Sequence, residues 1–271
     1  MRLLFIGDVV GRSGRTIVNA QLPILRDKWK LDFVVVNGEN AAGGFGITEA
    51  ICQELIDSGA DAVTLGNHSF DQREALIYIE RQPRLMRPAN YPAGTPGRGA
   101  NLIEAKDGRK VLVVNMLGRI FMDALDDPFM RIDQELAACP LVAGADATVI
   151  DFHAEATSEK QAFGLHVDGR ASLVVGTHTH TPSADHRILP GGTGFISDAG
   201  MSGDYDSVIG MDKEEPLRRF TRRIPAARFE PAVGPATLCG VALETGEDGL
   251  ARKIAAVRIG GILAPAAPDF W

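Results

Sequence analysis

Cysteine is scarce in this 271-residue chain, which holds only three. Cys52, Cys139 and Cys239 are odd in number and far apart, so they indicate neither a disulfide framework nor a thiolate metal site. We expect buried free thiols in a reducing compartment. Long hydrophobic runs are also missing, because the apolar stretch at the N-terminus is interrupted at Asp8. It is too short for a signal-peptide core or a membrane span, so we expect a cytoplasmic protein without a membrane partner.

Basic residues are fewer than acidic ones, which gives a formal net charge of -7 at pH 7. Stable binding of nucleic acid is not expected, because it depends on clustered Lys and Arg. A small anionic substrate remains open if bound metal supplies positive charge. Repeats and low-complexity tracts are absent, and the Pro- and Gly-rich stretch from Arg87 to Gly99 is interpreted as a long surface loop. We therefore expect one domain over residues 1–271.

Short continuous apolar runs alternate with helical patterns in the first half of the chain. Strands are expected over residues 3–6, 33–36 and 61–65, and helices over 13–29, 48–58 and 72–81. Ser13 and Thr48 are the expected N-caps of the first two helices. Continuous apolar strands between helices are typical of parallel sheets with helices on their faces.

The second half of the chain is richer in strands. Apolar runs cover residues 110–115, 147–152, 171–175 and 194–197, and a Gly- and Asp-rich loop follows over 198–212. Residues 237–244 and 254–259 flank a turn at 246–249 and indicate a hairpin. The whole pattern predicts an α/β fold with two sheets and helices outside, in which ligands bind at the carboxyl ends of the strands.

Polar side chains stand where five of these strands end. They are Asp8, then Glu39 and Asn40, then Asn67 and His68, then His153, and finally His178 and His180. Taken singly, each could be a turn residue, a helix cap or a packed side chain. Five coincidences favour a preformed site, because strand ends converge at one edge of a sheet. His166 and His186 lie in polar loop contexts and are assigned no role.

The segment from Gly7 to Gly14 follows a strand and opens a helix, as a dinucleotide-binding turn does. Val9 stands where close approach of a pyrophosphate requires glycine, and Asp8 would repel a phosphate in the absence of a cation. No Gly-Lys-Ser/Thr follows a glycine loop either, so a P-loop is excluded. A nucleotide cofactor is not expected.

The order Gly-Asp, Gly-Glu-Asn, Gly-Asn-His, a lone His and Gly-Thr-His-Thr-His resembles the calcineurin-like metallophosphoesterases. It is most similar to their bacterial YmdB-like branch, whose members are cyclic-nucleotide phosphodiesterases with a di-iron centre. Two departures from the general superfamily pattern favour this branch: Asp8 is not followed by the usual histidine, and Glu39 replaces the usual bridging Asp. The segments 151–155, 189–193 and 201–210 also resemble it, so the resemblance spans nearly the whole chain. It implies an α/β/β/α sandwich.

The resemblance implies two metal ions with seven ligands. One ion would be held by Asp8, Glu39, Asn40 and His180, and the other by Glu39, Asn67, His153 and His178. Imidazole, amide and carboxylate ligands without a thiolate suit iron, which the family implies, or manganese or zinc. Two ions about 3.5–4 Å apart would lower the pKa of a shared water and deliver it to phosphorus as a bridging hydroxide.

His68 is the expected general acid, because it is adjacent to Asn67 but is not itself an implied ligand. The alternative is that His68 only orients a ligand through a hydrogen bond.

The implied substrate is a small phosphodiester, a 2′,3′-cyclic or 3′,5′-cyclic nucleotide. A phosphomonoesterase of the same superfamily and a metal-binding regulatory protein with incidental turnover remain open. Phe45 and Tyr205 flank the expected site and are assigned no role, and a homo-oligomer is a reasonable expectation from the family.

Overall fold

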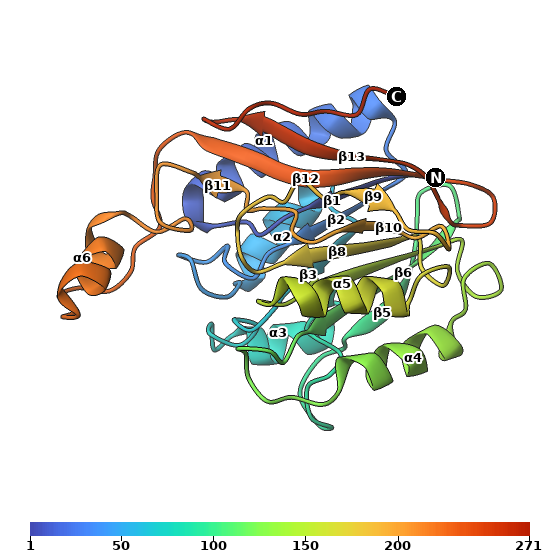
Figure 1. The fold of residues 1–271 in the computed structure, drawn as a ribbon, viewed down its shortest axis with the longest axis horizontal. Coiled ribbons are helices and arrows are strands. Elements are labelled where there is room, and N and C mark those ends of the chain that lie inside the picture. Colours follow the sequence, from blue (N-terminus) through green and yellow to red (C-terminus); the bar gives the residue numbers. More distant parts are fainter.

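Two β-sheets pack face to face in the computed structural model, which describes residues 1–271, and helices cover both outer faces (Figure 1). The first sheet contains β1 (Arg2–Ile6), β2 (Phe33–Asn37), β3 (Ala62–Thr64), β4 (Leu85–Met86), β11 (Gly203–Asp204), β12 (Ala236–Thr245) and β13 (Ala251–Gly260). The second contains β5 (Ala100–Glu104), β6 (Lys110–Leu117), β7 (Ala147–His153), β8 (Leu173–Thr177), β9 (Arg187–Ile188) and β10 (Gly194–Ile196). The helices are α1 (Gly11–Trp29), α2 (Glu49–Asp57), α3 (Ala75–Arg81), α4 (Pro128–Ala138), α5 (Thr157–His166) and α6 (Glu214–Arg222).

The centre of each sheet is parallel. The first sheet has the order β11-β12-β1-β2-β3-β4, with β13 beside β12, and β1 to β4 run parallel. The second has the order β5-β6-β7-β8-β10-β9, with β6, β7 and β8 parallel. The carboxyl ends of the parallel strands therefore lie at one edge of each sheet, toward the side of Figure 1 on which α6 lies.

Alternate side chains of a single strand enter two different cores. Leu4 and Val34 belong to the core beneath α1 and α2, whereas Phe5 and Val35 belong to the core between the sheets. A third core, which includes Phe163 of α5, lies between the second sheet and the helices α4 and α5. The predicted α/β/β/α layering is thus confirmed, and burial of both strand faces explains why the apolar runs are continuous.

The first helix begins earlier than the sequence predicted. Helix α1 starts at Gly11 without a side-chain cap, and the Ser13 hydroxyl instead donates to the carbonyl of Ala232 at 3.0 Å. The predicted Ser13 N-cap is therefore wrong. Thr48 does cap α2, because its Oγ1 accepts a hydrogen bond from the backbone N of Ile51 at 3.2 Å.

Three other local predictions need correction. His166 is the last residue of α5, where its Nε2 contacts Asp133 at 3.0 Å, and it does not lie in a loop. The stretch 87–99 is only partly a surface loop, because residues 87–90 are buried. Cys139 is only partly buried, whereas Cys52 and Cys239 are buried as expected. None of the six helices has the combination of length and apolar composition that a membrane span requires.

Candidate metal centre

The polar strand ends of both sheets meet at one shared edge. The first sheet supplies Asp8 after β1, Glu39 and Asn40 after β2, and Asn67 after β3, while the second supplies His153 at the end of β7 and His178 and His180 after β8. Each of these seven residues has a polar atom within hydrogen-bond or ion-pair distance of at least one of the others. The structure therefore brings together every residue that the resemblance implied as a ligand.

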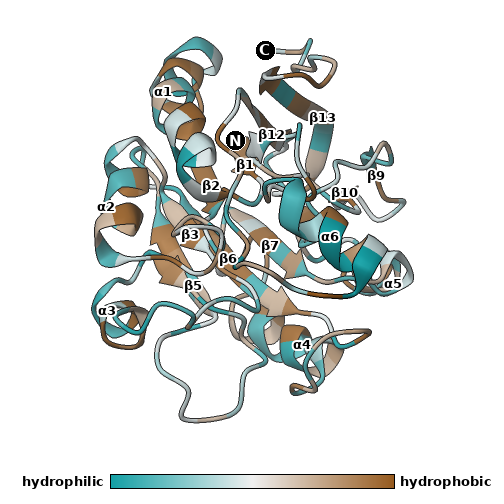
Figure 2. Cartoon of the chain, turned by 90° about the vertical axis from the view of Figure 1, so that its left-hand side faces the viewer, coloured by the Kyte–Doolittle hydropathy of each residue, from teal (hydrophilic) through white to brown (hydrophobic).

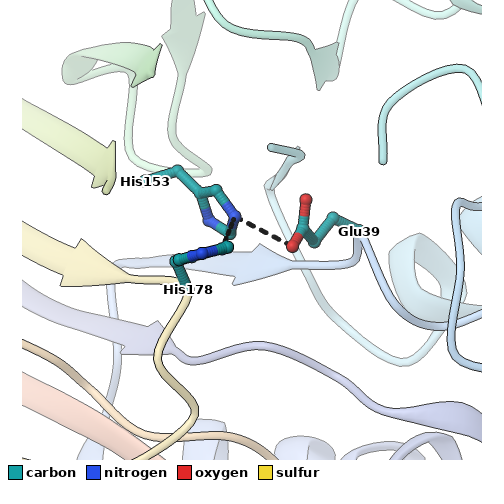
Figure 3. A group of neighbouring side chains, drawn as sticks. All are labelled: Glu39, His153 and His178. Atoms are coloured by element: carbon teal, nitrogen blue, oxygen red, sulfur yellow. Dashed lines mark hydrogen bonds and ion pairs between the residues drawn. The ribbon is translucent and has the colours of Figure 1, made fainter. Parts of the chain in front are cut away.

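One group of side chains converges on His153. Its Nε2 lies 2.9 Å from Glu39 Oε1, 3.0 Å from Asn67 Oδ1 and 3.1 Å from His178 Nδ1. Figure 3 shows Glu39, His153 and His178 directed at one another from three separate segments. Two ligands at right angles around an ion with bonds of about 2.1 Å are about 3 Å apart, so this spacing fits a cation.

A second group lies beside the first and shares a carboxylate with it. His180 Nε2 is 3.2 Å from Asn40 Oδ1 and 4.0 Å from Asp8 Oδ1. Ligand atoms of Asp8, Glu39 and His180 all lie within 4.8 Å of one another, as do those of Glu39, His153 and His178. Glu39 thus stands between two groups that could each hold a metal ion.

Hydrogen bonds behind the site fix which nitrogen of His153 faces the other ligands. His153 Nδ1 lies 2.8 Å from Thr177 Oγ1, and that hydroxyl donates to Asp151 Oδ1 at 2.6 Å. Because the hydroxyl proton is directed to the carboxylate, its oxygen is left to accept from His153 Nδ1. Nε2 of His153 is therefore the nitrogen directed at the position that a cation would occupy.

The other two histidines are oriented in the same way. His180 Nδ1 donates to the backbone carbonyl of Ile209 at 2.8 Å, which leaves its Nε2 as the nitrogen that could bind a metal ion. His178 Nε2 lies 3.2 Å from Glu155 Oε2, which leaves its Nδ1 toward His153. All three imidazoles therefore turn toward the site the nitrogen that is not hydrogen-bonded behind it, as metal-ligating histidines do.

The two acidic residues of the site are almost completely buried. Asp8 is 0% exposed, and its Oδ1 has no hydrogen-bond partner. Burial raises the pKa of Asp8, although His180 and His153 oppose this. Burial would also raise the pKa of Glu39, but the charge and hydrogen bond of His153 outweigh it and lower that pKa to about 2. A buried carboxylate oxygen without a donor is costly, and a metal ion would satisfy it.

Close packing around the carboxylate requires a glycine at position 66. A Cβ atom there would lie 2.2 Å from Glu39 Oε2 and 2.5 Å from His153 Nε2. His178 and His180 have φ angles of 97° and 64°, which are uncommon for residues other than glycine. Such strained backbone is found where a site over-determines its geometry.

His68 lies beside the two groups and belongs to neither. It lines a cavity of about 340 Å³ together with Glu39, Asn40, His178 and His180. Its backbone N donates to Glu39 Oε2 at 3.2 Å, and its Nδ1 lies 2.8 Å from Asp71 Oδ2. The ring is thus held at the cavity wall with one nitrogen occupied by a carboxylate.

Sequence reasoning missed the residues that orient the histidines. Asp151 lies in an apolar strand two residues before His153, and a carboxylate in a fully buried strand is a signal that could have identified it. Thr177 and Glu155 are each close in sequence to a predicted ligand but carry no signal of their own. The Ile209 carbonyl is a backbone group, so no residue type could have revealed it.

Residues 4–257 match the protein family described as YmdB-like protein. A Bacillus subtilis (strain 168) protein named 2′,3′-cyclic-nucleotide 2′-phosphodiesterase is 51% identical over 244 residues, which cover 90% of this chain and 91% of that protein. A Mycoplasma genitalium protein named putative phosphatase/phosphodiesterase is 37% identical over 227 residues, which cover 81% of this chain and 79% of that protein.

Solved structures agree with this relationship. A hypothetical protein from Thermus thermophilus superposes with a TM-score of 0.89 at 42% identity, covering 97% of this chain and 100% of that one. A structure described as a novel phosphatase from Mycoplasma pneumoniae superposes with a TM-score of 0.89 at 34% identity, covering 96% of this chain and 93% of that one. A 5′-nucleotidase precursor from Thermus thermophilus superposes with a TM-score of 0.53 at 14% identity, covering 98% of this chain and 54% of that one. At this low identity it shares the fold alone. The chain therefore belongs to the YmdB-like family and has a fold of the metallophosphoesterase type.

Proposed function

We propose that this chain is a metal-dependent phosphodiesterase that hydrolyses 2′,3′-cyclic nucleotides and, as a second substrate type, 3′,5′-cyclic nucleotides. The observation that carries the proposal is the placement of Glu39 between two groups of possible metal ligands, beside a cavity that His68 also lines. The name of the Bacillus subtilis relative supports the choice of substrate.

We propose that two ions, iron or alternatively manganese or zinc, occupy the site. Asp8, Glu39, Asn40 and His180 would hold one, and Glu39, Asn67, His153 and His178 the other. When bound, two such ions neutralise phosphate charge and lower the pKa of a water between them. Among the seven side chains only Asp8 and Glu39 are carboxylates, so the loaded pocket carries net positive charge and attracts an anionic ester in an acidic protein.

In this proposal His68 gives the proton that the leaving sugar oxygen needs. The Asp71 carboxylate accepts from His68 Nδ1, so that Nε2 is the nitrogen from which a proton would be transferred. Phe45 packs edge-on against the ring, with centroids 5.1 Å apart, and limits its rotation. A regulatory protein would need neither a complete set of metal ligands nor a general acid beside them. The presence of both kinds of residue therefore argues against a purely regulatory role.

The site also bears on domain organisation. Its side chains come from both sheets and from positions between residues 8 and 180, and the core between the sheets includes Leu243 of β12. We therefore propose that residues 1–271 act as one domain.

Turnover of 2′,3′-cyclic AMP, 3′,5′-cyclic AMP and 3′-AMP by the metal-loaded protein tests the proposed activity. We expect the 2′,3′-cyclic ester to be hydrolysed fastest. Cleavage of its 2′ ester, the bond in the relative's name, would leave 3′-AMP, which chromatography separates from 2′-AMP. Two relatives are described as phosphatases, so a phosphomonoesterase is the second candidate. Faster hydrolysis of p-nitrophenyl phosphate than of bis-p-nitrophenyl phosphate would favour that candidate and contradict ours.

A further inference from the structure

The cavity beside the metal residues has two chemically different walls. One wall is polar and carries Glu39, Asn40, His68, His178 and His180. A second part of the lining is largely apolar and carries Val208, Ile209, Met211, Pro216, Phe220 and Phe229. Several of these residues come from α6 and its flanking segments, and Figure 2 shows α6 in front of the strand ends. A ligand that fills this cavity therefore needs a polar, anionic end and a flat apolar end.

The apolar wall is joined directly to the metal edge. Val208 and Met211 exchange backbone hydrogen bonds at 2.9 and 3.0 Å, so Ile209 and Gly210 form a two-residue turn. Ile209 adopts a φ of 48°, an outlier for a β-branched residue, and its carbonyl accepts from His180 Nδ1 at 2.8 Å. The strained turn thus places an isoleucine side chain in the wall and an acceptor behind a predicted metal ligand.

Helix α6 presents aromatic surface to the same cavity. Pro216, Arg219 and Phe220 are spaced so that they share one face of the helix, and all three line the cavity. The Arg219 guanidinium lies 3.9 Å from the centre of the Phe229 ring, and Glu215 Oε1 fixes it through Nε at 2.8 Å. Phe220 is not buried against the protein, since 82% of it is exposed.

We propose that this apolar wall is the base-binding half of the active site and that Phe220 is its stacking residue. The inference rests on the proposed function and extends it, because it assigns the nucleoside end of the substrate to α6 and the 208–211 turn. Aromatic side chains stack on any base, so the wall would accept purines and pyrimidines alike. At about 340 Å³ the cavity is at the small end of ligand pockets, which fits a single nucleotide.

Two cyclic phosphate esters, one with a nucleoside and one without, test this inference. 2′,3′-Cyclic AMP and glycerol 1,2-cyclic phosphate share a five-membered cyclic phosphate, but only the first carries a base. We expect kcat/KM of the wild-type protein to favour the nucleotide at least about ten-fold, as stacking on one aromatic residue allows. Phe220→Ala should remove most of this preference through a higher KM for the nucleotide. Phe121→Ala is the matched control, because Phe121 is 89% exposed and does not line the cavity.

Binding of 3′-AMP to the metal-loaded protein, measured by calorimetry, decides the inference even if no substrate is turned over. Weaker binding by Phe220→Ala than by Phe121→Ala supports the base wall whether or not the proposed reaction is correct. Equal binding by the two variants overturns it. Equal wild-type kcat/KM for the two cyclic esters also overturns it while leaving the phosphodiesterase activity intact. The inference is also overturned if Phe220→Ala changes the sedimentation mass but not the substrate preference. That result would identify Phe220 as a contact between copies of the chain.

Discussion

Asp198 holds Thr179 in place between the two histidines that flank it. One carboxylate oxygen of Asp198 accepts hydrogen bonds from the Thr179 backbone N at 3.1 Å and from its hydroxyl at 2.7 Å. The same oxygen accepts from the buried Lys160 Nζ at 2.8 Å. His178 and His180 both have positive φ angles, so the carboxylate fixes a strained loop that carries two of the proposed ligands.

Removal of this carboxylate should destabilise the protein. Asp198→Ala leaves the Lys160 charge buried without a partner, and we expect the free energy of unfolding to fall by about 3–5 kcal/mol. Urea denaturation of the metal-free protein measures the loss. Asp206→Ala is the matched control, because Asp206 forms its ion pair with Lys213 at the surface. Equal effects of the two substitutions would show that Asp198 does not hold the loop.

Thr177 should act on metal binding through His153. Thr177→Val keeps the shape of the side chain but removes the acceptor for His153 Nδ1, so metal affinity should fall about 10–100-fold. Competition with a chelator measures the affinity. Thr148→Val is the control, since Thr148 is also buried but its hydroxyl has no hydrogen-bond partner. An unchanged affinity in Thr177→Val would mean that the hydrogen bond does not orient the imidazole.

Metal binding should release protons at neutral pH. Burial lowers the pKa of His153, but Glu39 more than compensates and raises it to about 9 in the metal-free protein. Below that pH His153 carries a proton that a cation must displace, so affinity should rise with pH and level off near pH 9. Titration of metal into a weakly buffered, metal-free sample at pH 7 should release close to one proton from this residue. No proton uptake or release, with full metal binding, would exclude the His153–Glu39 pair as a ligand pair.

His68 should matter for turnover and not for metal content. His68→Ala should retain both ions and the fold but lose about 10²–10⁴-fold in kcat, the usual contribution of a general acid. Asp71→Asn should cause a smaller loss, because it weakens only the hydrogen bond to Nδ1. The surface pair His166–Asp133 offers a control in His166→Ala, which should behave as wild type. A wild-type rate in His68→Ala would rule out the acid role.

Most of the strands and the convergence of their polar ends could be predicted because their signals are local. Continuous apolar runs reflect burial on both faces, and the polar residues that end them stand at the same edge in every parallel strand. Helix α6 was missed although it is amphipathic, because its few apolar positions lie among charged residues and the segment as a whole is strongly hydrophilic. Helix α5 was missed because Gly164 interrupts its pattern, and that glycine is needed where a Cβ would lie 2.5 Å from Phe195.

The hydrogen bonds that orient the proposed ligands could not be predicted, because they join distant parts of the chain. Asn37 and Thr64 from the first sheet both donate to Asp151 of the second. Ser13 resembles a helix cap in sequence, but a carbonyl more than 200 residues away accepts from its hydroxyl. Such pairings depend on how the sheets stack, which residue spacing does not encode.

We propose above that Glu39 joins two metal ions that together make the chain a phosphodiesterase. The most direct test measures metal content and hydrolysis of 2′,3′-cyclic AMP in stripped, iron-restored and manganese-restored protein, alongside Glu39→Ala. We expect two ions per chain, no turnover after stripping, recovery on restoration, and loss of both binding and turnover in Glu39→Ala. Full turnover by the stripped protein, or two ions and a wild-type rate in Glu39→Ala, would contradict the claim.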